Sequence, residues 1–569
     1  MRRLRPLPAC MREADIIVVG GGSAGAAVAA RLSADAARRV LLIEAGQDTP
    51  PGAVPADIRS TFPAAYFNSG YFWPGLTSSL RDGQPATPFL QPRVMGGGSS
   101  VMGMIAIPGL PGDFERWEQM GARHWGWQDV LPTYQAMICD LDVPSASRNV
   151  RGLNVVRRLP RESWPLYMKR IEQLISSPGT PPVMRFENTG RDGMFAAPLS
   201  HDEERASSAR CYLTAQVRAR SNLSVLADTH VRRITFDGRR VSGVIAACAS
   251  ETFSMAAPMV VVSCGAVHSP ALLLRSGIGP AQELHALGIP LVADRPGVGR
   301  NYQNHTQLHF SMTLKREGRL PPQAQHYIMS ALRFSSRLAE CPTGDLFLYF
   351  TGRVSPKSFG RRMAMVAVAL YTPFSRGLVK LTASDPDAPP QVEQRLLTDA
   401  RDAQRMIIAT RRAEELLLEP AVRACFDEIY VMPRRPPMRL INSTGPSGWL
   451  KGAAATAVLV APPGLRRFAI GAAIKPGRLV ADGAAVSRLS DEEILMASGA
   501  MFHPSSTCAI GAEADPMAVV DPQCRVYGVE GLRVADASVM PQIVSANTNM
   551  TAIMIGERVA EFIQRPSSV

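Results

Sequence analysis

Cysteine is scarce in this chain of 569 residues, and the cysteines form no recognisable pattern. There are nine, an odd number, and no two of them make a C-x-x-C pair. This usage argues against a disulfide framework and against a zinc site, which need paired or closely spaced thiols. We therefore expect no metal site, and we expect free buried thiols in a reducing compartment, the cytoplasm.

Lysine is also rare. Six of the 62 basic residues are lysine and the rest are arginine, spread along the chain without a stripe that alternates with aromatic residues. The net charge of +13 therefore reflects an arginine-rich composition. Nucleic-acid binding needs a clustered basic surface, so we expect no nucleic-acid partner. Attraction to an anionic membrane surface or an anionic substrate stays open.

Long apolar runs are missing too. No stretch of 18 or more uncharged apolar residues occurs, so we expect no membrane-spanning helix. Residues 1–10 have charge but no apolar run of signal-peptide length, and they are either a frayed arm or an artefact of the assigned start.

The length and the hydrophobic content of 46% indicate a globular chain of two to four domains.

The most informative motif lies near the N-terminus. A β-branched apolar run leads into Gly20-Gly-Gly22-Ser-Ala-Gly25, then come a small-residue stretch of helical propensity and a second apolar run ending at Glu44. This order is typical of a dinucleotide-binding unit. In such a unit Gly20 permits the turn and Gly22 lets backbone N–H groups meet a pyrophosphate. Gly25 allows close helix packing, and Glu44 accepts a hydrogen bond from a ribose hydroxyl.

Later segments complete a family resemblance. Residues 265–280 (GAVHSPALLLRSGIGP), 502–508 (FHPSSTC) and 531–551 follow in that order. They resemble the second signature, the catalytic-histidine segment and the closing flavin-contacting strand, loop and helix of the glucose–methanol–choline (GMC) flavin oxidoreductases. Residues 376–386 resemble the usual start of the substrate-domain half. The resemblance extends over nearly the whole chain.

The resemblance implies an α/β fold (α+β overall) with a Rossmann-like FAD-binding domain and an inserted substrate domain of a sheet plus helices. We predict that the FAD-binding domain is assembled from three parts of the chain and ends in a strand-rich tail. The predicted parts are 13–155, 185–305 and 500–565 for the FAD-binding domain, 156–184 for a connecting segment and 306–499 for the substrate-binding domain.

The resemblance also implies oxidation of an alcohol to a carbonyl. Hydride leaves the carbinol carbon only when the hydroxyl proton can leave, so a base must lie within hydrogen-bond reach of that oxygen. His503 is the predicted base. Asn547, where relatives carry His or Asn, is predicted to orient the alcohol. The predicted FAD contacts are Gly20, Gly22, Ser23, Ala24, Gly25, Glu44, Ala45, Val94, Gly97, Ser100, Val231, Asp536, Ala537 and Thr548.

Two positions depart from the family pattern. Relatives that attach FAD through a histidine carry it where this chain has Val101, so we expect FAD to be bound non-covalently. Met102 stands where Asn or His is usual near the flavin. The loss of that hydrogen bond would shift the redox poise or the reactivity with oxygen.

Two further segments concern substrate and partner. Choline-oxidising relatives place a glutamate where this chain has Gln307, and a quaternary ammonium needs a carboxylate or an aromatic cage, so we do not expect choline. Residues 450–474 contain two short apolar runs, which we interpret as a strand pair in the substrate-domain sheet. The alternative is an apolar lid that touches a membrane or admits an apolar substrate.

The predicted activity is oxidation of a primary or secondary alcohol, with electrons passed to a quinone or another carrier. Three alternatives stay open: an oxidase that makes hydrogen peroxide, a lyase of the same fold that keeps FAD for structure, and an inert flavin-binding protein. The location is expected to be cytoplasmic, with peripheral membrane contact open. The oligomeric state cannot be predicted.

Overall fold

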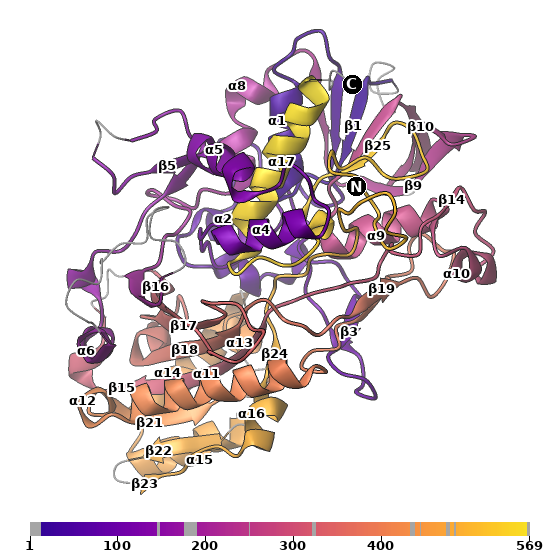
Figure 1. Cartoon of the computed structure of the whole chain (residues 1–569). Helices are drawn as coiled ribbons and strands as arrows, with labels where there is room; N and C mark the ends of the chain where they lie inside the picture. The colour runs from indigo at the N-terminus through magenta and orange to yellow at the C-terminus, as the bar shows by residue number, and fades with distance from the viewer. Residues whose placement is uncertain are drawn as a thin grey trace.

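The computed structural model of the protein describes most of the chain. The described residues are 13–144, 148–175, 191–249, 251–320, 326–432, 438–443, 445–473, 478–482 and 485–565. The arm predicted at residues 1–10 lies outside them. The molecule has two layers, each built on a sheet, stacked one above the other in Figure 1.

The first layer contains a five-stranded parallel sheet in the order β25-β12-β1-β2-β8. Its strands are β1 (Ile16–Val19), β2 (Val40–Ile43), β8 (Leu223–Leu226), β12 (Met259–Val262) and β25 (Leu532–Val534). β1 and β2 are buried throughout and consist of Val, Ile and Leu, as expected for parallel strands covered on both faces. The strands predicted around the glycine motif are therefore confirmed, and the C-terminal β25 closes the same sheet.

Helices α1 (Ser23–Leu32) and α17 (Thr548–Gln564) lie side by side on this sheet (Figure 1). A Cβ on Gly556 would stand 2.6 Å from the carbonyl oxygen of Ala24, so this close approach requires glycine. Ser23 Oγ donates to Asn549 Oδ1 at 2.7 Å, which ties the N-termini of the two helices together. The glycine motif and the C-terminal segment therefore meet at one place.

Smaller elements surround this sheet. An antiparallel sheet of β9 (His230–Asp237), β10 (Arg240–Cys248) and β11 (Glu251–Ala256) lies beside it. The neighbouring helices are α3 (Gly98–Val101), α4 (Pro111–Gln119), α5 (Trp127–Met137), α7 (Ser208–Tyr212), α8 (Ala215–Arg218), α9 (Gly265–Arg275) and α10 (Ala281–Ala286). A small four-stranded sheet has the order β19-β20-β3-β4, formed by β19 (Leu378–Lys380), β20 (Gln391–Glu393), β3 (Thr77–Ser79) and β4 (Thr87–Pro88). A separate strand pair is β5 (Ile138–Asp140) with β6 (Asn154–Val156).

The second layer is a nine-stranded antiparallel sheet. Along the sheet its strands are β23 (Ala485–Val486), β22 (Arg478–Asp482), β21 (Phe426–Val431), β15 (Thr306–Leu314), β18 (Met363–Leu370), β17 (Leu346–Thr351), β16 (Ile328–Phe334) and β7 (Gly193–Ala196), with β24 (Gly499–Ala500) beside β15. Helix α11 (Ala400–Leu418), predicted from its helical apolar spacing, covers one face through Met406, Ala409 and Ala413 (Figure 1). Shorter helices around the layer are α6 (Leu166–Ile175), α12 (Pro420–Arg423), α13 (Met438–Ile441) and α16 (Asp491–Ala497).

The α/β fold class is confirmed, but two local expectations are wrong. The strand pair expected at 450–474 is a pair of helices, α14 (Gly445–Val460) and α15 (Pro463–Ala473), and Ile474 lies outside the described residues. Alanine-rich runs favour helix over strand, and Pro463 occupies the first helical position of α15, where proline is tolerated. The tail after 499 is not strand-rich, because it contains β24, β25 and long loops before α17.

The division into domains remains a prediction. One strand departs from it: β7 lies within 185–305, the predicted second part of the FAD-binding domain, yet pairs with β16 in the nine-stranded sheet. Among the described residues, no helix has the length and apolar character needed to cross a bilayer.

Candidate active site

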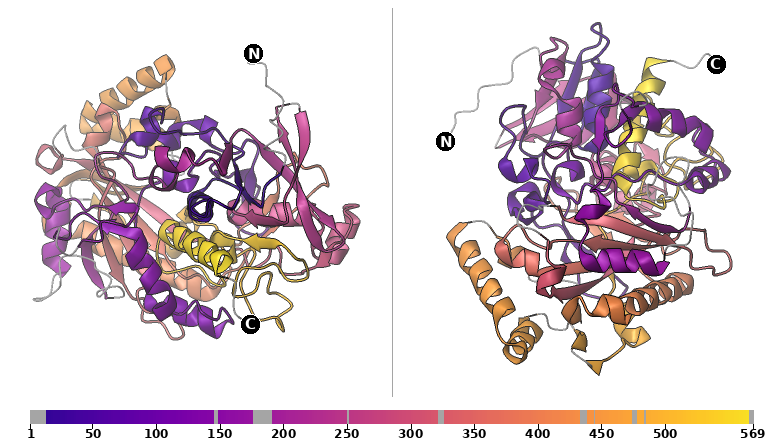
Figure 2. Two further views of the ribbon diagram at one scale, coloured as in Figure 1. Left: turned by 90° about the horizontal axis from the view of Figure 1, so that it is seen from above. Right: turned by 90° about the vertical axis from the view of Figure 1, so that its left-hand side faces the viewer.

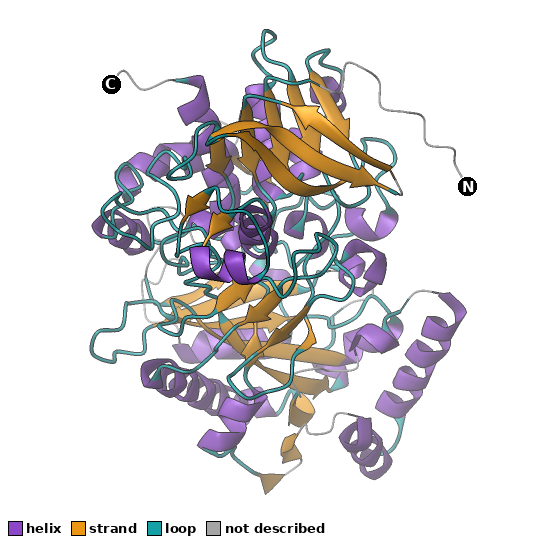
Figure 3. Ribbon diagram, turned by 90° about the vertical axis from the view of Figure 1, so that its right-hand side faces the viewer, coloured by secondary structure: helices purple, strands orange, loops and turns teal. Residues whose placement is uncertain are grey.

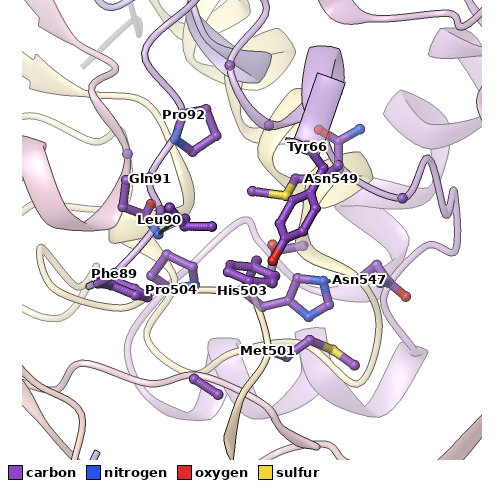
Figure 4. Close-up of a pocket in the computed structure, with 18 of the residues that line it drawn as sticks. Tyr66, Phe89, Leu90, Gln91, Pro92, Met501, His503, Pro504, Asn547 and Asn549 are labelled. Atoms are coloured by element: carbon purple, nitrogen blue, oxygen red, sulfur yellow. Dashed lines mark hydrogen bonds between the residues drawn. The ribbon is translucent and has the colours of Figure 1, made fainter. Parts of the chain in front are cut away.

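A cavity of about 1480 Å³ is lined by residues of both layers. From the first layer come the end of β1 and the start of α1, and from the second come side chains of β15, β17 and β18, among them His309, Tyr349 and Met365. Figure 4 shows part of this cavity around His503, with Asn547 beside it and Tyr66 above it. A cavity of this size exceeds that of a drug-sized ligand site and leaves room for a dinucleotide and a second molecule.

The glycine motif forms one wall of the cavity. Gly20 has φ +100°, and a Cβ there would stand 2.4 Å from Ser263 O, whereas a Cβ on Gly25 would stand 1.9 Å from Gly20 O. These two glycines are required by packing. At Gly22 the nearest atom to such a Cβ is 3.9 Å away, on a residue that lines the cavity. The open space at Gly22, before the N-terminus of α1, fits a pyrophosphate.

Two buried carboxylates brace this wall. Glu44 accepts from Gly21 N and Gly46 N, each at 2.8 Å, and burial raises its pKa. Asp536 accepts from Gly265 N at 2.9 Å and Ser538 N at 2.8 Å, and burial raises its pKa as well. Each carboxylate oxygen of Glu44 keeps a second lone pair that can accept another hydrogen bond. That a ribose hydroxyl donates to it stays a prediction.

Most of the predicted residues share this cavity. The predicted residues that line it are Gly20, Gly22, Ser23, Ala24, Glu44, Ala45, Val94, Gly97, Val231, His503, Asp536, Ala537, Asn547 and Thr548. Gly25 and Ser100 do not: Gly25 packs against the Gly20 turn, and the buried Ser100 donates its hydroxyl to Met95 O at 2.8 Å. Their role is to shape the wall from behind.

The central feature of the site is a series of hydrogen bonds that links a backbone carbonyl, His305, His503 and Asn547. His305 Nε2 faces the carbonyl oxygen of Val544 at 3.1 Å, His305 Nδ1 faces His503 Nδ1 at 2.9 Å, and His503 Nε2 faces Asn547 Nδ2 at 3.1 Å. A carbonyl oxygen only accepts, so His305 carries its proton on Nε2 and its Nδ1 is an acceptor. His503 must then donate from Nδ1. The lone pair of His503 is therefore on Nε2, toward Asn547 and the cavity.

Asn547 is fixed by tyrosines on β17 and at the end of β18. Tyr349 OH donates to Asn547 Oδ1 at 2.7 Å and Tyr371 OH lies 3.3 Å from the same oxygen, while the two hydroxyls contact each other. Because these hydroxyls point at Oδ1, the NH₂ group of Asn547 must face His503. The amide therefore donates an N–H to the lone pair of His503 Nε2.

Burial sets the charge of the two histidines. It lowers the pKa of His503 to about 3. It also lowers the pKa of His305 well below its usual value, with His503 adding to the effect. Both rings are therefore neutral at neutral pH, as the hydrogen-bond pattern requires.

Aromatic and thioether side chains line the cavity around His503. Tyr66 meets Phe502 edge to face with ring centroids 5.6 Å apart, and Phe62 meets Tyr327 at 5.7 Å. Met501 lies close to His503 in Figure 4. This lining favours an apolar ligand. Gln307, in the position compared with the choline-type glutamate, lines the cavity and donates to Ala500 O at 3.2 Å.

The two departures from the family pattern lie on α3 and at its end. Val101 is fully buried in an apolar cluster with Ile58 and Val94. Met102 lines the cavity, and its carbonyl accepts from Arg205 at 2.7 Å.

Sequence reasoning did not identify His305 and the tyrosines as site residues. His305 ends the same segment from which Gln307 was compared, so that segment was the available signal for it. Tyr349 lies in an apolar strand and Tyr371 directly follows one, and no local pattern distinguishes them from core residues.

Comparison with known proteins gives a consistent result. Two family models described as GMC oxidoreductase match residues 14–307 and 373–556. The chain is 35% identical to the 5-(hydroxymethyl)furfural oxidase of Methylovorus sp. (strain MP688), over 96% of this chain and 98% of that protein. It is 31% identical to an oxygen-dependent choline dehydrogenase of Brucella canis, over 97% and 95%. Its fold matches the crystal structure of pyridoxine 4-oxidase from Mesorbium loti with a TM-score of 0.77 and 24% identity, over 97% and 100%.

Proposed function

Because this chain belongs to the GMC oxidoreductase family and is an FAD-dependent oxidoreductase of alcohols, we propose that it oxidises an apolar, preferably aromatic, primary alcohol to the aldehyde with His503 as the base. The observation that carries this proposal is the lone pair of His503 Nε2, which meets the NH₂ group of Asn547 where both side chains line the cavity. An acceptor of a proton and a donor of a hydrogen bond are the two groups that an alcohol oxygen needs.

The proposed step uses these groups together. The alcohol oxygen displaces the hydrogen bond between the two side chains, gives its proton to His503 Nε2 and accepts a hydrogen bond from Asn547 Nδ2. As the O–H bond breaks, its electron pair forms the C=O bond and the carbinol hydrogen leaves as hydride. FAD supplies the acceptor of that hydride when it is bound along the Gly20–Ala24 wall. His503 then carries two N–H groups, and its Nδ1–H continues to donate to His305.

The aromatic lining of the cavity around His503 supports the choice of substrate. Tyr66, Phe502 and Tyr327 offer ring faces and edges, and the position corresponding to the choline-type glutamate holds the uncharged Gln307. A flat, neutral alcohol suits such a lining, because a quaternary ammonium would lose its water without gaining a carboxylate there. The activity for which the furfural oxidase relative is named agrees with this choice.

The experiment is anaerobic mixing of the yellow protein with an alcohol panel. We expect the flavin absorbance to bleach with benzyl alcohol and 5-(hydroxymethyl)furfural, and to bleach poorly with choline. Release of a carbonyl product without bleaching would indicate a lyase, and neither signal with any alcohol would indicate an inert flavin protein. Adding air or a soluble quinone to the reduced protein then measures which acceptor takes the electrons. Transfer to a quinone or another carrier remains the prediction.

A further inference from the structure

The helices α14 and α15, residues 445–473, present an exposed apolar face. Five large apolar side chains of the pair are more than half exposed, in contrast to the buried core of the second layer. They are Trp449 (70% exposed), Leu450 (62%), Val460 (56%), Leu465 (60%) and Phe468 (77%). In Figures 2 and 3 the pair stands at the edge of the molecule, to one side of the nine-stranded sheet.

The face is not the result of a loosely attached helix, because the opposite side of α14 is fastened to the body. Lys357 Nζ donates to the carbonyl oxygens of Ile441 at 2.6 Å and Ser443 at 3.2 Å, just before α14 begins. A Cβ on Gly452 would stand 2.6 Å from the Lys357 side chain, so α14 packs tightly there. These contacts fix one side of α14 against the body of the protein, and its apolar side faces outward.

The spacing along each helix places its exposed apolar side chains on one side of that helix. In α14 the exposed Leu450, Ala453, Ala457 and Val460 recur every three or four residues, which places them on one side of a helix. In α15 Leu465 and Phe468 recur in the same way. The two helices are joined through residues 461–462 and contact each other, so both stripes belong to one helical pair.

The sequence segment that carries this surface is basic, although Asp427 and Glu428 lie just before it and pair with Arg466. Residues 429–481 contain eight Lys or Arg and no Asp or Glu, although the whole chain has 49 acidic residues. Arg466 is buried against Glu428, with Nη2 to Oε1 at 2.6 Å, but Lys451 is exposed on α14 itself. An apolar surface that carries the exposed Lys451 in a basic segment matches an anionic lipid bilayer, whose headgroups attract cations and whose interior accepts Trp, Leu and Phe. A second copy of the same surface would be repelled by its like charge.

We propose that the α14–α15 face docks the enzyme on an anionic membrane surface, without spanning it. The proposal does not depend on the reaction, because Trp449, Leu450 and Phe468 lie outside the lining of the active-site cavity. It also selects the membrane-touching alternative that the apolar runs at 450–474 left open.

The test is co-sedimentation of the FAD-loaded protein with vesicles of phosphatidylcholine alone and of phosphatidylcholine with phosphatidylglycerol in equal parts. We expect the anionic vesicles to bind at least about tenfold more tightly, since basic residues near the surface contribute about 1 kcal/mol each. The triple variant Trp449→Ser, Leu450→Ser, Phe468→Ser should lose that binding, and Lys451→Glu should weaken it on anionic vesicles only. The matched control Leu174→Ser, Leu291→Ser, at sites 47% and 51% exposed elsewhere, should bind as wild type does.

Three results would overturn the proposal. One is wild-type protein that stays in solution with both kinds of vesicle. Another is a triple variant that binds as wild type does while keeping its flavin spectrum and its rate of flavin reduction. The third is a wild-type dimer, seen by sedimentation velocity, that the triple variant converts to monomer without any binding of lipid.

Discussion

His305 and His503 meet through their Nδ1 atoms, 2.9 Å apart, so one ring must donate and the other must accept. The carbonyl oxygen of Val544 decides which, because it requires the proton of His305 on Nε2. A backbone carbonyl thereby sets the tautomer of His503 and the direction of its lone pair. His305 acts as a positioning residue for the base.

The first prediction concerns His305. His305→Leu removes the acceptor for His503 Nδ1–H, so both tautomers of His503 become populated and the rate of flavin reduction should fall by about 10²-fold; a wrong tautomer costs up to about 10⁴-fold in a serine-protease triad. His305→Gln restores an acceptor oxygen and should recover part of the loss. Stopped-flow reduction at saturating alcohol measures both. Equal rates for His305→Leu and His305→Gln would contradict the positioning role.

Asn547 should matter less than the base itself. Asn547→Ala removes the donor to the alcohol oxygen but leaves His503, so reduction should slow by about 10-fold, the size expected for one lost hydrogen bond. Asn547→His keeps a donor and should retain measurable activity. Tyr349→Phe removes one hydrogen bond to Asn547 Oδ1. Its rate of flavin reduction should lie between the rates of Asn547→Ala and wild type. A larger loss in Tyr349→Phe than in Asn547→Ala would show that the amide is not the group being oriented.

The pH dependence of the reaction follows from the buried position of His503. Its neutral form is the base, and burial lowers its pKa to about 3. Above that pKa essentially all of His503 is in its reactive neutral form, and this form is lost as the pH falls through the pKa. We expect the rate constant for flavin reduction to stay level from about pH 5 to pH 8, because a histidine of ordinary pKa near 6.5 would give a rise across this range. Such a rise would mean that His503 is solvated when substrate is bound.

Cofactor attachment gives an independent prediction. Val101 offers no atom for a covalent bond to FAD and lies fully buried among apolar side chains, so acid precipitation should leave the yellow colour in the supernatant. Gly22→Val should abolish FAD binding, since its side chain would enter the space at the start of α1. Ala286→Val, at the end of the distant helix α10, is a control that should keep a full complement of FAD. Colour in the pellet, or a yellow Gly22→Val protein, would contradict this account.

Local patterns were enough to predict the part of the first layer around the glycine motif. The glycine motif, its flanking strands and Glu44 are consecutive in the chain, and their periodicity reports their structure directly. The runs at 450–474 were misread because short apolar runs do not separate helix from strand, and the alanine content was the better guide. His305 and Tyr349 each lie 198 residues from their partners, His503 and Asn547. Such contacts exist only once the two layers meet.

The central claim is that His503 removes the alcohol proton, and its most direct test is anaerobic stopped-flow reduction of His503→Ala beside wild type with the best alcohol of the panel. The account predicts that reduction slows by about 10² to 10⁴-fold, the usual range for a positioned base. FAD content should stay at the wild-type level, because the cofactor wall at Gly20–Gly25 is untouched. A His503→Ala protein that holds FAD and reduces it at the wild-type rate would contradict the account.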